Sequence, residues 1–169
     1  AQMATLPRIQ PRRFYDVVIE VAIVRPGPIV GQLTSPLLQR RAGKQPVVCL
    51  DPEVHERLLP ILSRTYGVVL FQEQMLSVAM ELAGFTGTQA EELRRALGFR
   101  RDDGRILRVT AKLRQAMLAR GWSEGVAAKV VDATQSFALY GFPESHAFSF
   151  GLLAYGSTWL KVHRVAAFY

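Results

Sequence analysis

The stretch Phe71–Gly84, FQEQMLSVAMELAG, decides the fold class of this chain. Apolar residues recur along it at the three- and four-residue spacing of one face of an α-helix, and they are Phe71, Met75, Val78, Ala79 and Leu82. Gly84 ends the pattern, and glycine readily takes the left-handed conformation that closes many helices. The stretch therefore predicts an amphipathic helix with one buried face.

Helical signals continue on the C-terminal side of this stretch. In TGTQAEELRRALG, Thr88 and Glu91 form a possible capping box for a short helix that Gly98 can close. Three further helical patterns follow, with Ser123 as the N-cap of the second: RILRVTAKLRQAMLARG, SEGVAAKVVDATQSFALYG and ESHAFSFGLLAYGSTWLKVH. The uncharged run within the last pattern, 145–160, is shorter than the roughly 20 apolar residues of a membrane span. We expect a buried core helix there and no membrane partner.

The N-terminal side carries mixed signals. Residues 1–13 contain two prolines and no apolar period, which predicts a connector before a domain that covers 14–169. Residues 14–24 are rich in β-branched side chains, so their composition alone leaves strand and helix open. Asp51 followed by Pro52 is a typical helix start. The expected fold is mainly α, with at most a short β pair at 46–50 and 68–70.

Composition favours a binding partner that carries phosphate. The chain has 169 residues with a formal net charge of +7, and 17 of its 21 cationic side chains are arginine. The planar fork of arginine suits bidentate phosphate binding, so nucleic acids and nucleotides are the favoured partners. The single cysteine, Cys49, excludes an internal disulfide. The chain starts at Ala1 without a signal peptide, and we expect it to be a piece of a longer protein.

The chain lacks the motifs of a catalytic centre. Its five aspartates form no alternating pair for two metal ions, and its three histidines lie far apart in the sequence without a cysteine at ligand spacing. It also has no phosphate-binding glycine loop and no nucleophile elbow. We therefore expect no catalytic residue and no metal ligand.

Arginines after the deciding stretch are the first candidates for binding. They occur in EELRRALGFRRDDGRILR at positions 94, 95, 100, 101, 105 and 108. From the residues alone, two interpretations stand: a dedicated phosphate site, or a solvated basic face. Arg94 and Arg95 also complement the negative end of their helix, an effect of about 0.3–1 kcal/mol that needs no ligand.

The second candidate is YGFPESHAFSF, where a turn leads Ser145 and His146 into a helix start. Free backbone N–H groups at such a start can bind an anion together with these side chains. The alternative is structural, with Ser145 as the N-cap and His146 as a partly buried core residue.

Five motifs, in this order and at these gaps, resemble the bacterial C-family DNA polymerases, the family of the DNA polymerase III α subunit. They are VAIVRPGPI, YGVVLFQEQM, AGFT…ELRRAL, YGFPESHAFSFGLLAY and WLKVHRVAAF. MATLPRIQPRRFYDVVIEVAIVRPGPI and GFPESHA are similar to the error-prone branch, which acts in damage-induced mutagenesis and translesion synthesis. The resemblance covers about residues 3–168.

This resemblance implies a piece of the fingers domain, with helix at 14–24. The catalytic carboxylates and their Mg²⁺ then lie outside this chain, which alone would be inactive. The family's arginine pair falls on Arg94 and Arg95, which would contact the triphosphate of the incoming dNTP, and its Ser-His pair falls on Ser145 and His146, near the sugar. The DNA contacts we expect are Arg100, Arg101, Arg105 and Arg108.

The resemblance also implies partners and a location. The partners are primer-template DNA, the dNTP and the rest of the polymerase chain, with the sliding clamp and mutagenesis accessory proteins bound through other regions. The location is cytoplasmic. The alternative hypotheses are a non-enzymatic basic helical module that binds nucleic acid, and a degraded remnant that does not fold alone.

Four positions depart from the family pattern: Val30, Phe148, Gly151 and Val165. Phe148 is larger than the alanine the family usually has, and overpacking a buried site costs about 1–3 kcal/mol unless neighbours shrink. Gly151 costs about 1 kcal/mol inside a helix, and it is the candidate for making that room.

Overall fold

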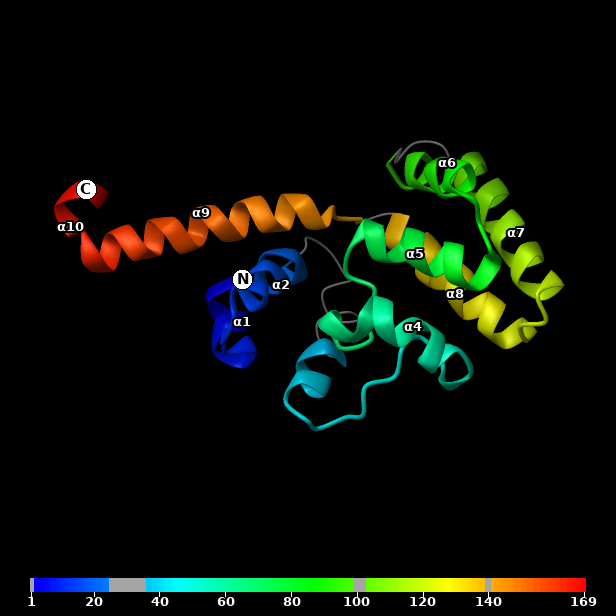
Figure 1. The fold of residues 1–169 in the computed structure, drawn as a ribbon, viewed down its shortest axis with the longest axis horizontal. Helices are drawn as coiled ribbons and strands as arrows, with labels where there is room; N and C mark the ends of the chain where they lie inside the picture. Colours follow the sequence, from blue (N-terminus) through cyan, green and yellow to red (C-terminus); the bar gives the residue numbers. More distant parts are fainter. Residues whose placement is uncertain (1, 25–35, 99–102, 139–140) are drawn as a thin grey trace.

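The chain is mainly helical in the residues that the computed structural model describes, 2–24, 36–98, 103–138 and 141–169 (Figure 1). Its α-helices are α1 (Gln2–Ile9), α2 (Phe14–Ile23), α4 (His55–Leu62), α5 (Gln72–Ala83), α6 (Gly87–Gly98), α7 (Asp103–Ala119), α8 (Glu124–Ala138), α9 (Glu144–His163) and α10 (Val165–Phe168). Two 3-10 turns, η1 (Pro52–Val54) and η2 (Ser63–Thr65), flank α4, and residues 36–41 are also helical. None of these described residues forms a strand, so the mainly α prediction is confirmed and the permitted β pair is not formed.

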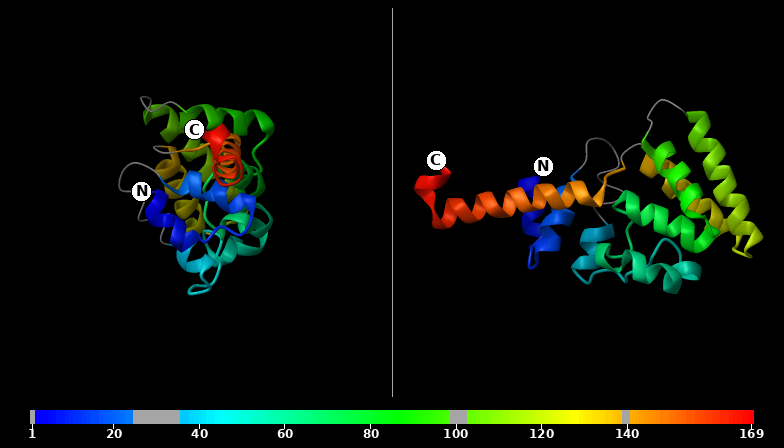
Figure 2. Two further views of the ribbon diagram at one scale, coloured as in Figure 1. Left: turned by 90° about the vertical axis from the view of Figure 1, so that its left-hand side faces the viewer. Right: turned by 45° about the horizontal axis from the view of Figure 1, so that its top comes forward.

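Helices α4 to α8 pack around the larger apolar core, and the right-hand view of Figure 2 shows them gathered at one end of the described chain. The predicted stripe of α5 faces this core, with Met75, Val78 and Leu82 fully buried. Burial of each such side chain contributes about 1.5–3 kcal/mol, less the entropy of ordering it. Gly84 ends α5 with φ of 67°, as the sequence predicted. The deciding stretch therefore forms the helix and the core face expected of it.

A second core joins this body to the N-terminal helices. It includes Val18 and Ile19 from α2, Leu37 from the helical residues 36–41, and Ala147 from α9. Leu70 and Phe71, which lie just before α5, are fully buried in it. The start of α5 therefore connects the two cores.

Residues 14–24, which left strand and helix open by composition, form helix α2 up to Ile23. The β-branched residues Val18, Ile19 and Ile23 lie on its buried face, so packing outweighs their weak intrinsic preference. Asp16 accepts hydrogen bonds from the backbone N–H groups of Arg12 (2.7 Å) and Arg13 (3.0 Å), which satisfies donors at the helix start. The helix implied by the family resemblance is confirmed.

The first thirteen residues, expected as a connector, contain the helix α1. Ile9 at its C-terminal end is 1% exposed and belongs to the second core. Pro7 lies inside this eight-residue helix, which explains why the sequence pattern gave no helical signal there. The domain boundary at residue 13 remains a prediction.

Helix α9 departs most from expectation. We predicted a buried core helix over 145–160, but within α9 only Ala147 and Gly151 are buried. Large apolar side chains beyond Gly151 are exposed, among them Leu152, Leu153, Tyr155 and Trp159. Figure 1 shows α9 extending away from the body after it passes α2, with the C-terminus at its far end. The prediction was wrong because an apolar run does not reveal what covers it.

Two of the four departures lie at the contact between α2 and α9. A methyl group at Gly151 would lie 3.3 Å from Val18 Cγ2 and 3.4 Å from Phe14 Cζ, so glycine lets α2 approach closely. The Phe148 ring packs half-buried against Phe14 and Tyr15, with centroids 5.7 and 5.8 Å away. The small residue and the large one both lie against Phe14, and that Gly151 makes room for Phe148 stays a prediction, because the atoms closest to Gly151 belong to Val18 and Phe14.

The other two departures lie elsewhere. Val165 is the first residue of α10, which begins after Arg164 breaks α9 with φ of −142° and ψ of 57°. Val30 lies outside the described residues.

Candidate functional site

Helix α6 carries the first candidate pair and is anchored by its start. Thr86 and Gln89 form the capping box: the Thr86 N–H donates to Gln89 Oε1 (2.8 Å), and the Gln89 N–H donates to Thr86 Oγ1 (3.3 Å). Our prediction of Thr88 and Glu91 as this box was wrong. Phe85 and Ala90, the positions that flank such a box, are both buried and hold the helix against the body.

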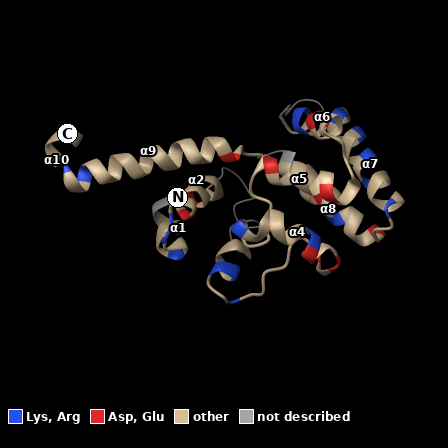
Figure 3. Cartoon of the chain, viewed as in Figure 1, with Lys and Arg blue, Asp and Glu red and all other residues tan. Residues whose placement is uncertain are grey.

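Arg94 and Arg95 of α6 are exposed, whereas Leu93 and Leu97 of the same helix are buried. Figure 3 shows that α6 and α7 carry both cationic and acidic residues. Arg94 binds the Glu91 carboxylate in bidentate fashion, from Nε at 2.7 Å and from Nη2 at 2.8 Å. Arg95 Nε donates to the same carboxylate at 3.0 Å. Two guanidinium forks therefore share one carboxylate on the surface of the helix.

The two arginines lower the pKa of Glu91. Hydrogen bonds from Arg94, and then from Arg95, hold the pKa of Glu91 at about 2, below its usual value of 4.5. The same carboxylate raises the pKa of Arg94. The cluster keeps one net positive charge at neutral pH, and its exposed ion pairs are weak in water.

The remaining predicted DNA contacts belong to the next part of the chain. Arg108 is exposed and Arg105 is half-buried, both on α7. Lys112 on α7 binds the Glu92 carboxylate of α6 at 3.1 Å, which ties the two helices together at the surface. Arg100 and Arg101 lie outside the described residues.

Ser145 and His146 lie in the first turn of α9, where both are exposed. The structural alternative for them is wrong, because the N-cap is Pro143 and the His146 side chain is not in a core. The His146 ring packs edge-on between Phe142 and Phe150, with centroid distances of 5.0 and 4.7 Å. Aromatic contacts of this kind fix the orientation of the imidazole.

Acidic side chains surround this helix start. The Glu144 N–H donates to Glu73 Oε2 (2.9 Å), so that donor is not available to an anion. Tyr15 donates its hydroxyl to Glu144 Oε1 (2.6 Å). Burial raises the pKa of Tyr15, and the bond to Glu144 raises it further, so the phenol keeps its proton. The helix start is therefore fastened to α5 and α2 by carboxylates.

The structure does not bring the two predicted pairs into contact. Among the described side chains, no hydrogen bond, ion pair or ring contact joins Arg94 or Arg95 to Ser145 or His146. The pairs are separate features, and a ligand that reaches both would have to bridge them.

A metal centre is not found in the described part of the chain, where no three His, Cys, Asp or Glu side chains are grouped to hold an ion. None of the helices in these same residues is long and apolar enough to cross a membrane.

The sequence did not lead us to predict a second group of arginines. Arg8, Arg12, Arg13, Arg41 and Arg64 line one cavity of about 860 Å³ beside α1 and α2. Three of them fall within six residues of the sequence, which was an available signal. It was missed because that segment was assigned to a connector.

Comparison with known proteins gives consistent matches. The family model described as the bacterial DNA polymerase III alpha subunit finger domain matches residues 1–121. Error-prone DNA polymerase 1 of Agrobacterium fabrum is 48% identical over 163 residues, which are 96% of this chain and 15% of that protein. The error-prone DNA polymerases of Pseudomonas aeruginosa and Teredinibacter turnerae are each 47% identical, over 99% and 100% of this chain and 16% of their own length. The chain thus spans about one sixth of the relatives it matches.

Proposed function

This chain belongs to the family of the bacterial DNA polymerase III alpha subunit finger domain, and from that premise we propose that it is the nucleotide-binding segment of an error-prone DNA-directed DNA polymerase. The intact enzyme transfers a nucleotidyl group from a dNTP to a primer. The carboxylates that perform the chemistry lie outside this chain, which is inactive alone.

The observation that carries the proposal is the pair of arginine forks gathered on Glu91. An arginine fork binds a carboxylate and a phosphate with the same bidentate geometry, so Glu91 occupies the position of an anionic ligand. An incoming triphosphate carries more negative charge than one carboxylate, and it displaces Glu91 from Arg94 and Arg95. The forks then face the triphosphate without a large rearrangement of the anchored helix.

These arginines act by positioning and by charge. Phosphoryl transfer needs the reacting groups held in line and the negative charge of the phosphates stabilised as it redistributes. Arg94 and Arg95 supply both from the nucleotide side. Mg²⁺ supplies charge neutralisation at the phosphates when the enzyme binds it, and the described residues here offer no cluster that fits it.

Other residues extend the same role. Ser145 and His146 lie beside the sugar of the nucleotide, where the aromatic contacts of His146 keep its ring in one orientation. Arg100, Arg101, Arg105 and Arg108 contact the DNA backbone. The partners are primer-template DNA, the dNTP and the rest of the polymerase, with the clamp and accessory proteins bound elsewhere. The activity belongs to DNA repair and translesion synthesis in the cytoplasm.

The test replaces both arginines, Arg94→Ala with Arg95→Ala, in the full-length polymerase. Removal of a preorganised donor lowers turnover by about 10²–10³-fold, so we expect at least about 100-fold lower kcat/KM for nucleotide incorporation. Steady-state incorporation on a primer-template measures it. The control is Arg57→Ala with Lys129→Ala, which also removes two exposed, ion-paired cations but from α4 and α8. Equal kcat/KM in the two double variants would remove the role assigned to Arg94 and Arg95.

A further inference from the structure

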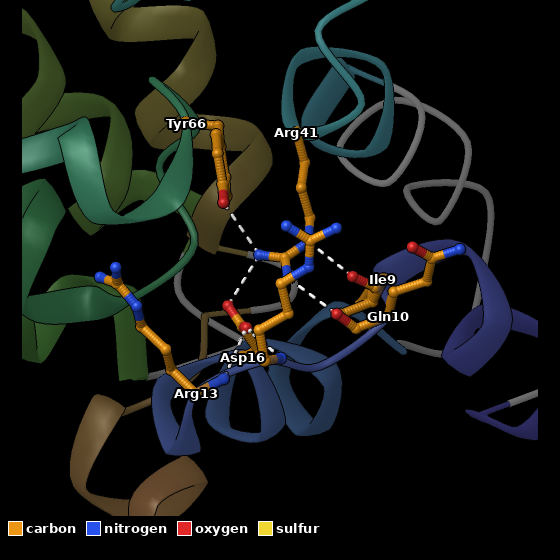
Figure 4. Close-up of polar contacts among 7 residues, drawn as sticks. Ile9, Gln10, Arg13, Asp16, Arg41 and Tyr66 are labelled. Carbon is orange, nitrogen blue, oxygen red and sulfur yellow. Dashed lines mark hydrogen bonds and ion pairs between the residues drawn. The ribbon is translucent and has the colours of Figure 1, made fainter.

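The cavity beside α1 and α2 is built around Arg41, whose guanidinium group makes four hydrogen bonds. Arg41, from the helical residues 36–41, donates from Nε to the carbonyl of Ile9 (2.6 Å) and from Nη2 to the carbonyl of Gln10 (3.1 Å). Its Nη1 donates to Asp16 Oδ1 (2.7 Å) and to the Tyr66 hydroxyl (2.8 Å) (Figure 4). Arg41 therefore fixes the loop between α1 and α2 against the turn at Tyr66.

The acidic residue of the cavity is neutralised by this network. Burial opposes ionisation of Asp16, but hydrogen bonds from Arg41 and from the N–H groups of Arg12 and Arg13 outweigh it and lower the pKa of Asp16. Asp16 and Arg41 are each 11% exposed at the side chain, and their charges cancel. The pair contributes no net charge, and its carboxylate already accepts three hydrogen bonds.

Four other arginines line the same cavity without a neutralising partner. Within the described part of the chain, the guanidinium groups of Arg8, Arg12, Arg13 and Arg64 make no ion pair. Figure 4 shows the Arg13 side chain directed away from the carboxylate that its own backbone binds. Arg64 stacks on the Tyr15 ring, with Cζ 3.6 Å from the centroid, which restricts its orientation. Four like charges gathered at one cavity repel one another unless an anion joins them.

The turn that carries Arg64 and Tyr66 is held in a rare backbone conformation. Tyr66 and Gly67 have φ of 54° and 77°, and Tyr66 is not a glycine. Gly67 is required, because a Cβ there would lie 2.6 Å from the carbonyl oxygen of Val48. This turn directs the Tyr66 hydroxyl to Arg41 and the Tyr66 carbonyl to Arg40 Nη1 (2.9 Å). Strain of this kind persists where the surrounding structure fixes a site.

The chemistry of the cavity selects the ligand. Arginine forks bind phosphate oxygens bidentately, whereas the backbone donors at the start of α2 are already used by Asp16, so recognition comes from side chains. A single carboxylate cannot bind all four guanidinium groups at once, so the ligand carries several anionic oxygens. A volume of about 860 Å³ admits more than one phosphate together with its sugar.

We infer that this cavity is a phosphate-binding site for a nucleic acid backbone, held by Arg8, Arg12, Arg13 and Arg64 and separate from Arg94 and Arg95 on α6. Figure 1 shows α1 and α2 on the opposite side of the body from α6. The inference rests on the proposed function only in naming DNA as the nucleic acid. The contacts are to phosphates, so they fix the position of the strand and carry no sequence preference.

The test is Arg12→Ala with Arg13→Ala in the full-length protein, because both side chains are exposed and neither supports a core. Fluorescence anisotropy measures Kd for a labelled primer-template between 50 and 200 mM salt. We expect about tenfold weaker binding at low salt and a slope of log K against log salt that is shallower by about two, because two fewer phosphates are neutralised. The control is again Arg57→Ala with Lys129→Ala, which removes the same charge elsewhere.

DNA affinity and the KM for dNTP, measured on the same variant, distinguish the phosphates of the DNA backbone from those of a free nucleotide. Weaker DNA binding with an unchanged KM for dNTP assigns the site to the backbone. A raised KM with unchanged DNA affinity assigns it to the free nucleotide and supports the phosphate chemistry alone. DNA affinity, salt slope and KM all equal to those of the control overturn the inference. That result would leave the test at Arg94 and Arg95 unaffected, so the two proposals fail separately.

Discussion

Two groups of arginines in this chain differ in the carboxylates within their reach. On α6, Arg94 and Arg95 are exposed and both bind Glu91, three and four residues away on the same helix. Beside α1 and α2, one arginine takes up the carboxylate that lines the cavity, and Arg8, Arg12, Arg13 and Arg64 make no ion pair in the described part of the chain. We call Arg94 and Arg95 the covered group, because Glu91 binds both, and Arg8, Arg12, Arg13 and Arg64 the open group, while Arg41 is a structural anchor. A count of charges does not separate these roles.

The largest effect we expect is the difference in the free energy of unfolding between a substitution of Arg41 and one of Arg12. Arg41→Ala leaves the nearly buried Asp16 without its partner, and removing one member of a buried pair costs about 3–5 kcal/mol. Arg12→Ala, at an exposed position, should change the free energy of unfolding by less than about 0.5 kcal/mol. Urea denaturation of the chain measures both. Similar destabilisation by the two substitutions would show that the groups do not differ structurally.

The pH dependence of stability tests the same ion pair of Asp16 with Arg41. The lowered pKa of Asp16 means that its contribution to stability is fully present above its unfolded pKa, near 4, and is lost as pH falls through the lower folded value. In Arg41→Ala the folded pKa should rise toward the unfolded one. The stability of this variant should therefore depend less on pH below about 4 than that of the unchanged chain, as denaturation at several pH values can establish.

We expect a smaller loss of stability from a change at the start of α6, the helix that carries Arg94 and Arg95. Thr86→Ala removes the N-cap of α6 and should cost about 1 kcal/mol, whereas Thr88→Ala, which removes the expected but unused cap, should cost less than half of that. The two thermal midpoints compare the caps directly. A greater destabilisation at Thr88 would contradict the capping box described for α6.

Glu91→Gln removes the carboxylate from Arg94 and Arg95, so these arginines lose their ion pairs and become like those of the cavity. It removes the charge that binds Arg94 and Arg95 and that, under the proposed function, competes with a triphosphate for them, while it keeps nearly the same volume. We expect the KM for dNTP in the full-length enzyme to fall a few-fold, since exposed ion pairs are worth about 0.2–1 kcal/mol. Glu92→Gln, which faces Lys112, is the matched control. A raised KM would mean that Glu91 positions the arginines and does not compete with the ligand.

The finest measurement is the titration of Glu91 itself. With a pKa of about 2 in the folded chain, its carboxylate should stay charged through the whole range in which the protein is folded. In Arg94→Ala with Arg95→Ala the carboxyl signal followed by NMR should titrate near the usual value of 4.5. An unchanged midpoint would mean that the two guanidinium groups do not hold the carboxylate in solution.

Local patterns predicted most of the helices correctly. The stripe of α5, the end at Gly84 and the cap at Ser123, whose Oγ accepts from the Val126 N–H (3.3 Å), all depend on residues within a few positions of one another. The capping box of α6 was missed because Thr86 with Gln89 and Thr88 with Glu91 both fit the pattern, and the burial of Phe85 and Ala90 decides between them. Such burial is not visible in the sequence.

Long-range contacts explain the rest. Asp16 and Arg41 are 25 residues apart, and no periodicity connects them. The pairing of Glu91 with the two arginines follows from helical spacing, yet the sequence alone could not choose between a ligand site and a surface pair. The helix at 14–24 came from the family resemblance, since its composition fits a strand equally well.

Helix α9 has a mechanical consequence that its exposure alone does not express. Its contacts with α2 extend to Tyr155, whose ring centroid lies 6.2 Å from that of Phe14, and eight further residues rise about 12 Å beyond it, so a tilt of about 10° there displaces His163 by about 2 Å. Helix α2 also carries Tyr15 and Asp16 of the cavity wall. Because α9 packs on α2 at its N-terminal end, a tilt of α2 that α9 followed as a rigid rod would be larger at His163 than at Tyr155.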